Sequence, residues 1–135
     1  MKSSEYRETA KEADEQELLF EWAELMVETG TYPCLEWMFH VANGEKRDKA
    51  TAVKLKRMGV KSGVPDVVLP HAAWGFCGMY VEMKRLKGGQ HSEAQMKWIE
   101  HLAREGYFVV SCRGFEDAKT QIENYIKGKI RRGVA

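Results

Sequence analysis

Two short runs of strand-forming residues, 65–69 and 79–84, lie on either side of a single loop, and both runs carry charged side chains. Side chains alternate across a β-strand, so Glu82 and Lys84 share one face of the second run and its apolar residues share the other. If the two runs pair through the loop between them, Asp66 lies on the same face as Glu82. The pattern therefore predicts two carboxylates and an ammonium group at one point of a small sheet.

Neighbouring carboxylates repel each other unless a positive charge lies between them. Mg²⁺ suits such a pair, because it prefers oxygen ligands and is often held by one or two carboxylates together with a substrate phosphate. A bound cation would polarise that phosphate and lower the pKa of a bound water. Lys84 could then orient or deprotonate the water, or stabilise charge on the phosphate. The alternative is purely structural: a salt bridge between Glu82 and Lys84, with Pro-Asp as an ordinary start of a strand.

The composition indicates one soluble globular domain. The chain has 135 residues, of which 44% are apolar and 30% charged. Residues 72–81, an uncharged stretch in the second half of the chain, are far too few for a membrane span, and the polar, acidic residues 1–16 do not resemble a signal peptide. We therefore expect a cytoplasmic protein without membrane association. Three cysteines, without metal-ligand spacing, argue against a disulfide framework and a zinc ribbon.

Charge is distributed unevenly along the chain. Residues 1–36 hold ten acidic and three basic side chains, whereas residues 37–135 hold eighteen basic and ten acidic ones. The bases are concentrated in residues 46–61 and again in residues 127–132. Such a segment is either a phosphate-binding surface or a solvated helix face, and the charge pattern alone leaves both open.

The hydrophobic periodicity predicts an alternation of helices and strands. The expected order is helix, strand, helix, strand, strand, helix, strand and helix, over residues 8–28, 37–42, 48–58, 65–69, 79–84, 92–105, 107–112 and 116–127. Asp48 is a suitable N-cap for the short basic helix. Ser92 and Gln95 have the spacing of a capping box. This order predicts one α/β sandwich around a small mixed sheet.

Five stretches together resemble a known family: residues 15–23, 42–47, 56–66, 80–85 and 92–107. The sequence Gly63-Val64-Pro65-Asp66, followed by Glu82-Met83-Lys84, resembles the PD-(D/E)XK nuclease fold. More narrowly, the chain resembles the virus-type replication-repair nuclease (VRR-NUC) family in its short stand-alone phage or prophage form. Ala42 is a departure, since proline is expected before Asn-Gly. The resemblance implies an α/β fold with a small mixed sheet flanked by helices. It implies a single domain over residues 1–135, with a core of about 12–126 and a basic tail over 127–135.

The resemblance also implies Mg²⁺- or Mn²⁺-dependent cleavage of DNA phosphodiester bonds. Asp66 and Glu82 match the family's metal ligands, and the backbone carbonyl of Met83 would add a third oxygen. Lys84 matches the catalytic lysine.

An acidic residue on the first helix usually completes such a site. Glu12 is preferred, because it lies one turn before Gln16 on a common stripe, and Glu15 is the competitor. Gln95 matches a site glutamine of these nucleases. The alternative for Gln95 is that it only completes the capping box with Ser92.

The basic segment would contact DNA in such a nuclease. The residues expected to bind backbone phosphates beside the site are Asn43, Lys46, Arg47, Lys54 and Lys56. Trp74, in the loop between the two site strands, is either an ordinary loop residue or a dimer or junction contact, and the ordinary role is favoured. His91 has no cysteine partner at ligand spacing and is interpreted as a non-ligand.

Stand-alone members of the family are dimers that can act on four-way junctions. The resemblance therefore implies a homodimeric endonuclease for Holliday junctions or other branched DNA in phage replication, recombination or repair. A helicase or recombination protein would be a fitting partner, and a bacterial or phage-infected cell the setting. Two alternatives remain: a catalytically silent DNA-binding module on the same fold, and an interaction domain without a role on nucleic acid.

Overall fold

The computed structural model describes residues 3–42, 48–84, 86 and 88–130, with side chains described from residue 14 onward. The elements, in order, are α1 (Ser3–Glu28), the 3-10 helix η1 (Pro33–Trp37), β1 (Phe39–His40), α2 (Lys49–Arg57), β2 (Val67–Leu69), β3 (Met79–Lys84), α3 (Glu93–Arg104), β4 (Phe108–Arg113) and α4 (Gly114–Lys127). The predicted alternation is confirmed, with η1 as an addition.

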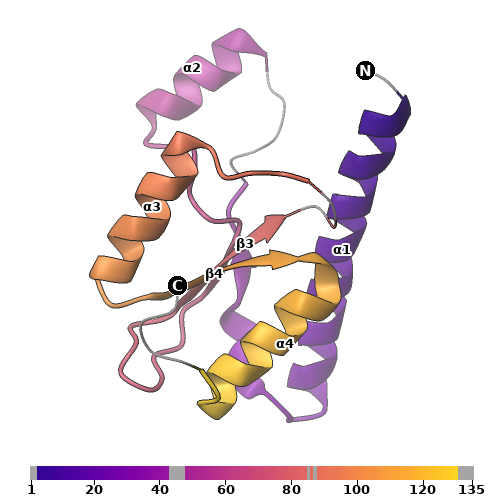
Figure 1. Cartoon of the computed structure of the whole chain (residues 1–135), viewed down its shortest axis with the longest axis vertical. Helices are drawn as coiled ribbons and strands as arrows, with labels where there is room; N and C mark the ends of the chain where they lie inside the picture. Colours follow the sequence, from indigo (N-terminus) through magenta and orange to yellow (C-terminus); the bar gives the residue numbers. More distant parts are fainter. Residues whose placement is uncertain (1–2, 43–47, 85, 87, 131–135) are drawn as a thin grey trace.

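The strands form a mixed sheet in the order β1-β2-β3-β4. β2 runs antiparallel to β1 and to β3, whereas β3 and β4 run parallel and are connected through α3. Helices α1 and α4 cover one face of the sheet and α3 covers the other (Figure 1). The expected small mixed sheet between helices is therefore what the chain forms.

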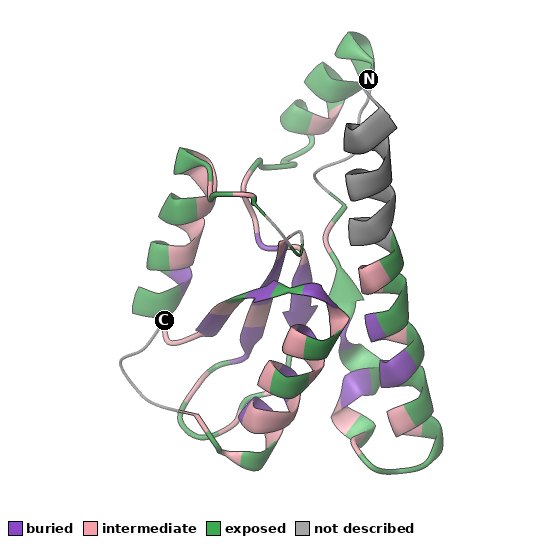
Figure 2. Cartoon of the chain, turned by 45° about the vertical axis from the view of Figure 1, so that its right-hand side comes forward, coloured by how far each residue is buried: buried purple, intermediate pink, exposed green. Residues whose placement is uncertain are grey.

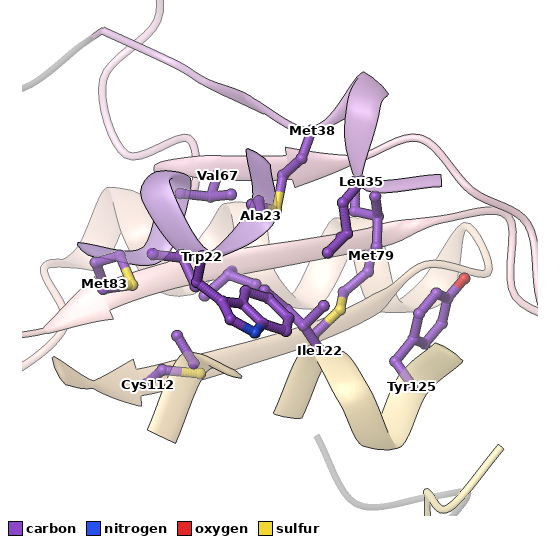
Figure 3. Packing of buried hydrophobic residues seen from close by; sticks show 14 of the residues in the cluster. Trp22, Ala23, Leu35, Met38, Val67, Met79, Met83, Cys112, Ile122 and Tyr125 are labelled. Carbon is purple, nitrogen blue, oxygen red and sulfur yellow. The ribbon is translucent and has the colours of Figure 1, made fainter. Parts of the chain in front are cut away.

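The core lies between the sheet and the pair α1 and α4. Met79, Val81 and Met83 alternate along β3 toward this side, and each is at most 2% exposed. Figure 3 shows how side chains from both helices and the sheet interlock there. The buried cluster consists of Leu19, Trp22, Ala23, Leu35, Met38, Val67, Leu69, Met79, Val81, Met83, Phe108, Cys112, Ala118, Ile122 and Tyr125. Because β3 gives its apolar residues to this face, its polar residues are directed to the α3 side.

The first strand is shorter than predicted. We expected a strand over residues 37–42, but only Phe39–His40 pairs with β2, and Trp37 ends the helix η1. Pro33, at the start of η1, has a fixed φ that favours a helical turn over an extended chain. β2 also starts two residues later than expected, at Val67. The turn expected at Asn43-Gly44 lies outside the described residues.

Helix α2 stands apart from the sheet in both views (Figures 1 and 2). Asp48 caps it as predicted, since its Oδ1 accepts a hydrogen bond from the Thr51 backbone at 2.7 Å. The hydrogen bonds from Thr51 lower the pKa of the Asp48 carboxyl. Apart from the half-buried Leu55, its side chains are exposed. Packing against the core therefore places little constraint on the residues of α2.

Trp74 packs within the chain. Its indole donates a hydrogen bond to the carbonyl of Ile126 at 3.2 Å, and a Cβ added to Gly128 would lie 2.5 Å from its ring. The ring therefore covers the end of α4, while 53% of the residue stays exposed.

Two further properties concern the cysteines and the helices of the chain. The three cysteines are free thiols, and burial, with the charge of Asp117, raises the pKa of Cys112 to about 12. Within the part of the chain that the structure describes, no helix combines the length and the apolar character of a membrane span.

Candidate active site

The structure brings Asp66 and Glu82 together on one face of the sheet. Val67 faces Val81 in the antiparallel pair β2–β3, so extending the register by one residue sets Asp66 opposite Glu82. The backbone N–H of Met83 donates to Oδ2 of Asp66 at 2.9 Å. This hydrogen bond fixes the Asp66 carboxylate against β3.

Glu82 is a buried acid. It is 3% exposed and is the one charged residue classed as buried in the described part of the chain. Its Oε1 accepts a hydrogen bond from Nε2 of Gln95 at 3.3 Å. Burial of a carboxylate costs several kcal/mol unless charge and hydrogen bonds compensate it. A fold that keeps such a group beside a second carboxylate points to a functional site.

Gln95 joins the acid to the lysine. Lys84 Nζ donates to Oε1 of Gln95 at 3.0 Å, and the Ser92 backbone N–H donates to the same oxygen at 2.8 Å. Ser92 and Gln95 also form the predicted capping box at the start of α3. One amide therefore caps the helix and links Glu82 with Lys84, so the two roles considered for Gln95 coexist.

A glycine allows these elements to meet. Gly63, in the loop before β2, has φ +88°, and a Cβ there would lie 2.7 Å from the backbone carbonyl carbon of Ala94. Only glycine accepts both this conformation and this approach. The loop that leads to Asp66 therefore packs directly on the helix that carries Gln95.

The donor set fits a hard divalent cation. Asp66 and Glu82 present carboxylate oxygens from neighbouring strands, which is the chemistry that Mg²⁺ and Mn²⁺ prefer. The described residues contain no group of three His, Cys, Asp or Glu placed to hold a metal. Glu12, the preferred third acid, lies where side chains are not described. Two carboxylates suit a cation that takes its other ligands from water and substrate phosphate.

Glu15 has a structural partner. Its Oε2 accepts a hydrogen bond from the Phe115 backbone N–H at 2.8 Å, at the first turn of α4. The carboxylate thus satisfies a backbone donor that the helix itself leaves open. This contact ties α1 to α4.

The predicted DNA-binding residues are only partly described. Lys54 and Lys56 are exposed on α2. Asn43, Lys46 and Arg47 lie outside the described residues.

Sequence reasoning missed a group of polar residues on β4. The parallel register sets Ser111 opposite Glu82 and Arg113 opposite Lys84. Ser111 Oγ lies 2.6 Å from Nε2 of His91, which follows the glycine pair after β3. The helix between the two strands was the available signal, because a strand-helix-strand order favours parallel pairing.

The sheet is mixed and has helices on both faces, with Asp66 directly before the central strand β2 and with Glu82 and Lys84 on the central strand β3. These features define the PD-(D/E)XK class of nuclease folds. The chain belongs to the VRR-NUC family, since the model of the VRR-NUC domain matches residues 5–116. A solved structure described as a VRR_NUC domain protein is 30% identical, with a TM-score of 0.73 over 87% of this chain and 88% of that chain. No curated protein matches the chain. The family and fold expected from the sequence are thus confirmed, and membership indicates a nuclease-type function in DNA processing.

Proposed function

We propose that the chain is a metal-dependent endodeoxyribonuclease that hydrolyses DNA phosphodiester bonds. The observation that carries this proposal is the buried carboxylate of Glu82, which lies beside Asp66 and is joined through Gln95 to Lys84. Two acids and a lysine on one sheet face provide ligands for a cation and a positive group for a phosphate.

Asp66 and Glu82 would hold Mg²⁺ or Mn²⁺, with the Met83 carbonyl and Glu12 as further ligands. When bound, the cation supplies charge that polarises the phosphate and acidifies a water. Glu12 is preferred over Glu15 because Glu15 already accepts the Phe115 N–H.

Lys84 would stabilise the negative charge that develops on the phosphate. Its Nζ donates to Gln95 Oε1 and, at 3.4 Å, to the carbonyl of Gln90. Both partners only accept hydrogen bonds, so the nitrogen acts as a donor here, and an ammonium has three N–H groups to give. With two N–H groups given to these oxygens, the third N–H of the ammonium is left to donate to a phosphate oxygen. Gln95 is then a positioning residue that fixes the ammonium relative to Glu82.

DNA would be held by the basic segment before β2. Lys54 and Lys56 on α2, with Asn43, Lys46 and Arg47, would contact backbone phosphates on either side of the cut. Such contacts position the duplex without reading its sequence.

The proposed substrate is branched DNA, with a four-way junction first. A two-fold homodimer suits this substrate, because paired sites can cut symmetric strands. The setting would be phage replication, recombination or repair in the cytoplasm of a bacterial or phage-infected cell, with a helicase or recombination protein delivering the junction.

Covalently closed circular DNA tests the endonuclease, because a circle offers no end to an exonuclease. With Mg²⁺ or Mn²⁺ we expect nicking that EDTA abolishes and that Glu82→Gln, a neutral side chain of the same shape, reduces by about 100-fold or more. Folded wild-type protein that binds DNA but cuts none with either metal would instead identify a silent DNA-binding module.

A labelled four-way junction and a linear duplex of the same sequence test the substrate shape. We expect faster cutting of the junction, and a dimer in sedimentation equilibrium. Equal rates on both substrates would contradict the proposed structure selectivity but agree with the proposed nuclease function.

A further inference from the structure

A pocket of about 370 Å³ opens beside the proposed catalytic residues, on the β4 side of Lys84. Lys84, His91, Ser111 and Arg113 contribute to its wall, and none of its lining residues in the described part of the chain is acidic. Among these residues only Lys84 belongs to the proposed catalytic set. The pocket is therefore a feature that the catalytic proposal leaves unexplained.

The sheet register sets this pocket next to the two acids. Ser111 lies opposite Glu82 and Arg113 opposite Lys84 in the parallel pair β3–β4. Neighbouring strands are about 4.8 Å apart, and opposed residues point to the same face. The pocket is thus one strand spacing from the carboxylates, on the α3 side of the sheet.

The polar groups of the pocket are held in place by the fold. The Arg113 guanidinium donates to the carbonyl oxygens of Gly88 and Gly89, both of which have positive φ. The imidazole Nε2 of His91 lies 2.6 Å from Ser111 Oγ. These contacts arrange the cationic and hydroxyl groups before any ligand arrives, which lowers the cost of binding.

Among the described residues, the charged side chains in the wall of the pocket, Lys84 and Arg113, are both cationic. Burial, and then the charges of Lys84 and Arg113, lower the pKa of the His91 imidazole. The histidine therefore experiences the positive potential of both neighbours. Such a potential attracts an anion whose oxygens accept hydrogen bonds from guanidinium, ammonium and hydroxyl groups.

We propose that this pocket, formed by Lys84, His91, Ser111 and Arg113, is a subsite for a DNA backbone phosphate, namely the phosphodiester next to the one that is cut. The inference rests on the proposed nuclease function and deepens it. A strand that crosses from the two acids toward β4 would bring its neighbouring phosphate over Ser111. The subsite would fix the register of the strand, so that the scissile phosphate faces Asp66 and Glu82.

A matched pair of substitutions tests the subsite. Ser111 is exposed on β4, and Ser111→Asp and Ser111→Asn introduce side chains of the same shape that differ in charge. Binding to labelled DNA is measured by fluorescence anisotropy in EDTA, at several salt concentrations, after melting curves show that both variants fold. We expect Ser111→Asp to bind roughly 10-fold more weakly than Ser111→Asn, with a log–log salt slope smaller by about 0.9, equivalent to one lost phosphate contact.

A methylphosphonate, an uncharged analogue of the phosphodiester, shows which DNA phosphate contacts the subsite. After the cut is mapped, a methylphosphonate is placed at the phosphate next to it. Wild-type protein should lose affinity for this DNA, whereas Ser111→Asp should bind it as weakly as it binds ordinary DNA. A Ser111-dependent preference for a 5′-phosphate end over internal phosphates would overturn the proposal and assign the pocket to a strand end.

The outcomes separate the two proposals. Suppose that the wild-type protein cuts DNA, and that Ser111→Asp and Ser111→Asn have equal DNA affinity and equal salt slope. This result would contradict the subsite but agree with the proposed nuclease function. Wild-type protein that neither binds nor cuts DNA would overturn both.

Discussion

Gln95 connects helix capping with the geometry of the site, and a matched pair of variants separates the two. Ser92→Ala removes one bond of the capping box and keeps the contacts of Gln95 with Glu82 and Lys84. Gln95→Ala removes the other bond of the box, from the Ser92 N–H to Oε1 of Gln95, together with the contacts to Glu82 and Lys84. We expect each change to cost about 1 kcal/mol of stability, but only Gln95→Ala to lower kcat, by roughly 10- to 100-fold. Equal activity of the two variants in single-turnover assays would mean that Gln95 acts only as a helix-capping residue.

Glu12 and Glu15 differ in what their removal should change. The Glu15 carboxylate accepts a hydrogen bond from Phe115 at the start of α4. Glu15→Ala should therefore cost about 1 kcal/mol in a denaturant titration and leave cleavage nearly intact. Glu12→Gln should leave stability nearly unchanged and slow cleavage by about 100-fold. The reverse pattern would make Glu15 the first-helix ligand.

We expect His91 to make stability depend on pH. Its pKa is lowered in the folded protein by burial and by Lys84 and Arg113, so the unfolded chain protonates this residue more readily. Stability should fall as pH drops through the unfolded value of about 6.5, and the loss should be complete below the lowered folded value. We expect the melting temperature of the wild type to fall more between about pH 7 and pH 5 than that of His91→Gln. Parallel pH profiles of the two proteins would show that His91 has no such effect.

Helix α2 can be tested as a DNA-binding element because the core does not depend on it. Lys54 and Lys56 are exposed, so Lys54→Gln with Lys56→Gln should leave the melting temperature unchanged. DNA affinity should drop, and the log–log salt slope should shrink by about 2 if each lysine contacts a phosphate.

The matched control removes Lys119 on α4 and Lys129 just after it, because α4 lies on the opposite side of the sheet from α3. Lys119→Gln with Lys129→Gln changes the net charge by the same amount. An equal loss of affinity in both double variants would mean that general charge, and not α2, binds the DNA.

Elements formed by local signals were predictable from the sequence. The α3 capping box needs only Ser92 and Gln95, and β3 was correctly predicted from alternation alone. The face shared by Glu82 and Lys84 follows from the same alternation. These features depend on neighbours within a few residues, which a sequence pattern records directly.

Features that depend on distant segments were not predictable in the same way. The hydrogen bond that the Phe115 N–H donates to Glu15 spans 100 residues. The β4 pocket required knowledge that β4 pairs parallel to β3 and in which register. The strand expected over residues 37–42 is shorter than predicted, because Trp37 belongs to the helix η1. In each case the deciding partner is far away in the chain or is a competing local turn.

At the scale of the whole molecule, α1 and α2 differ in charge. α1 carries the exposed acids Glu17, Glu21, Glu24 and Glu28, and it covers the sheet face opposite α3 (Figure 1). The site residues lie on the α3 face, where Gly63 packs on Ala94 and links the basic α2 segment to it. The exposed acids along α1 would repel a polyanion, whereas the exposed lysines of α2 would attract it.

Single-turnover cleavage of a four-way junction by wild-type and Lys84→Ala protein tests the proposed site most directly. Both proteins are compared in Mg²⁺, Mn²⁺ and EDTA, with melting curves and DNA affinities measured in parallel. We expect metal-dependent cutting by the wild type, and a loss of about 100-fold or more in the cleavage rate of Lys84→Ala at saturating DNA, without loss of folding. Cutting in EDTA, or cutting by Lys84→Ala at the wild-type rate, would contradict the assignment of this site to DNA hydrolysis.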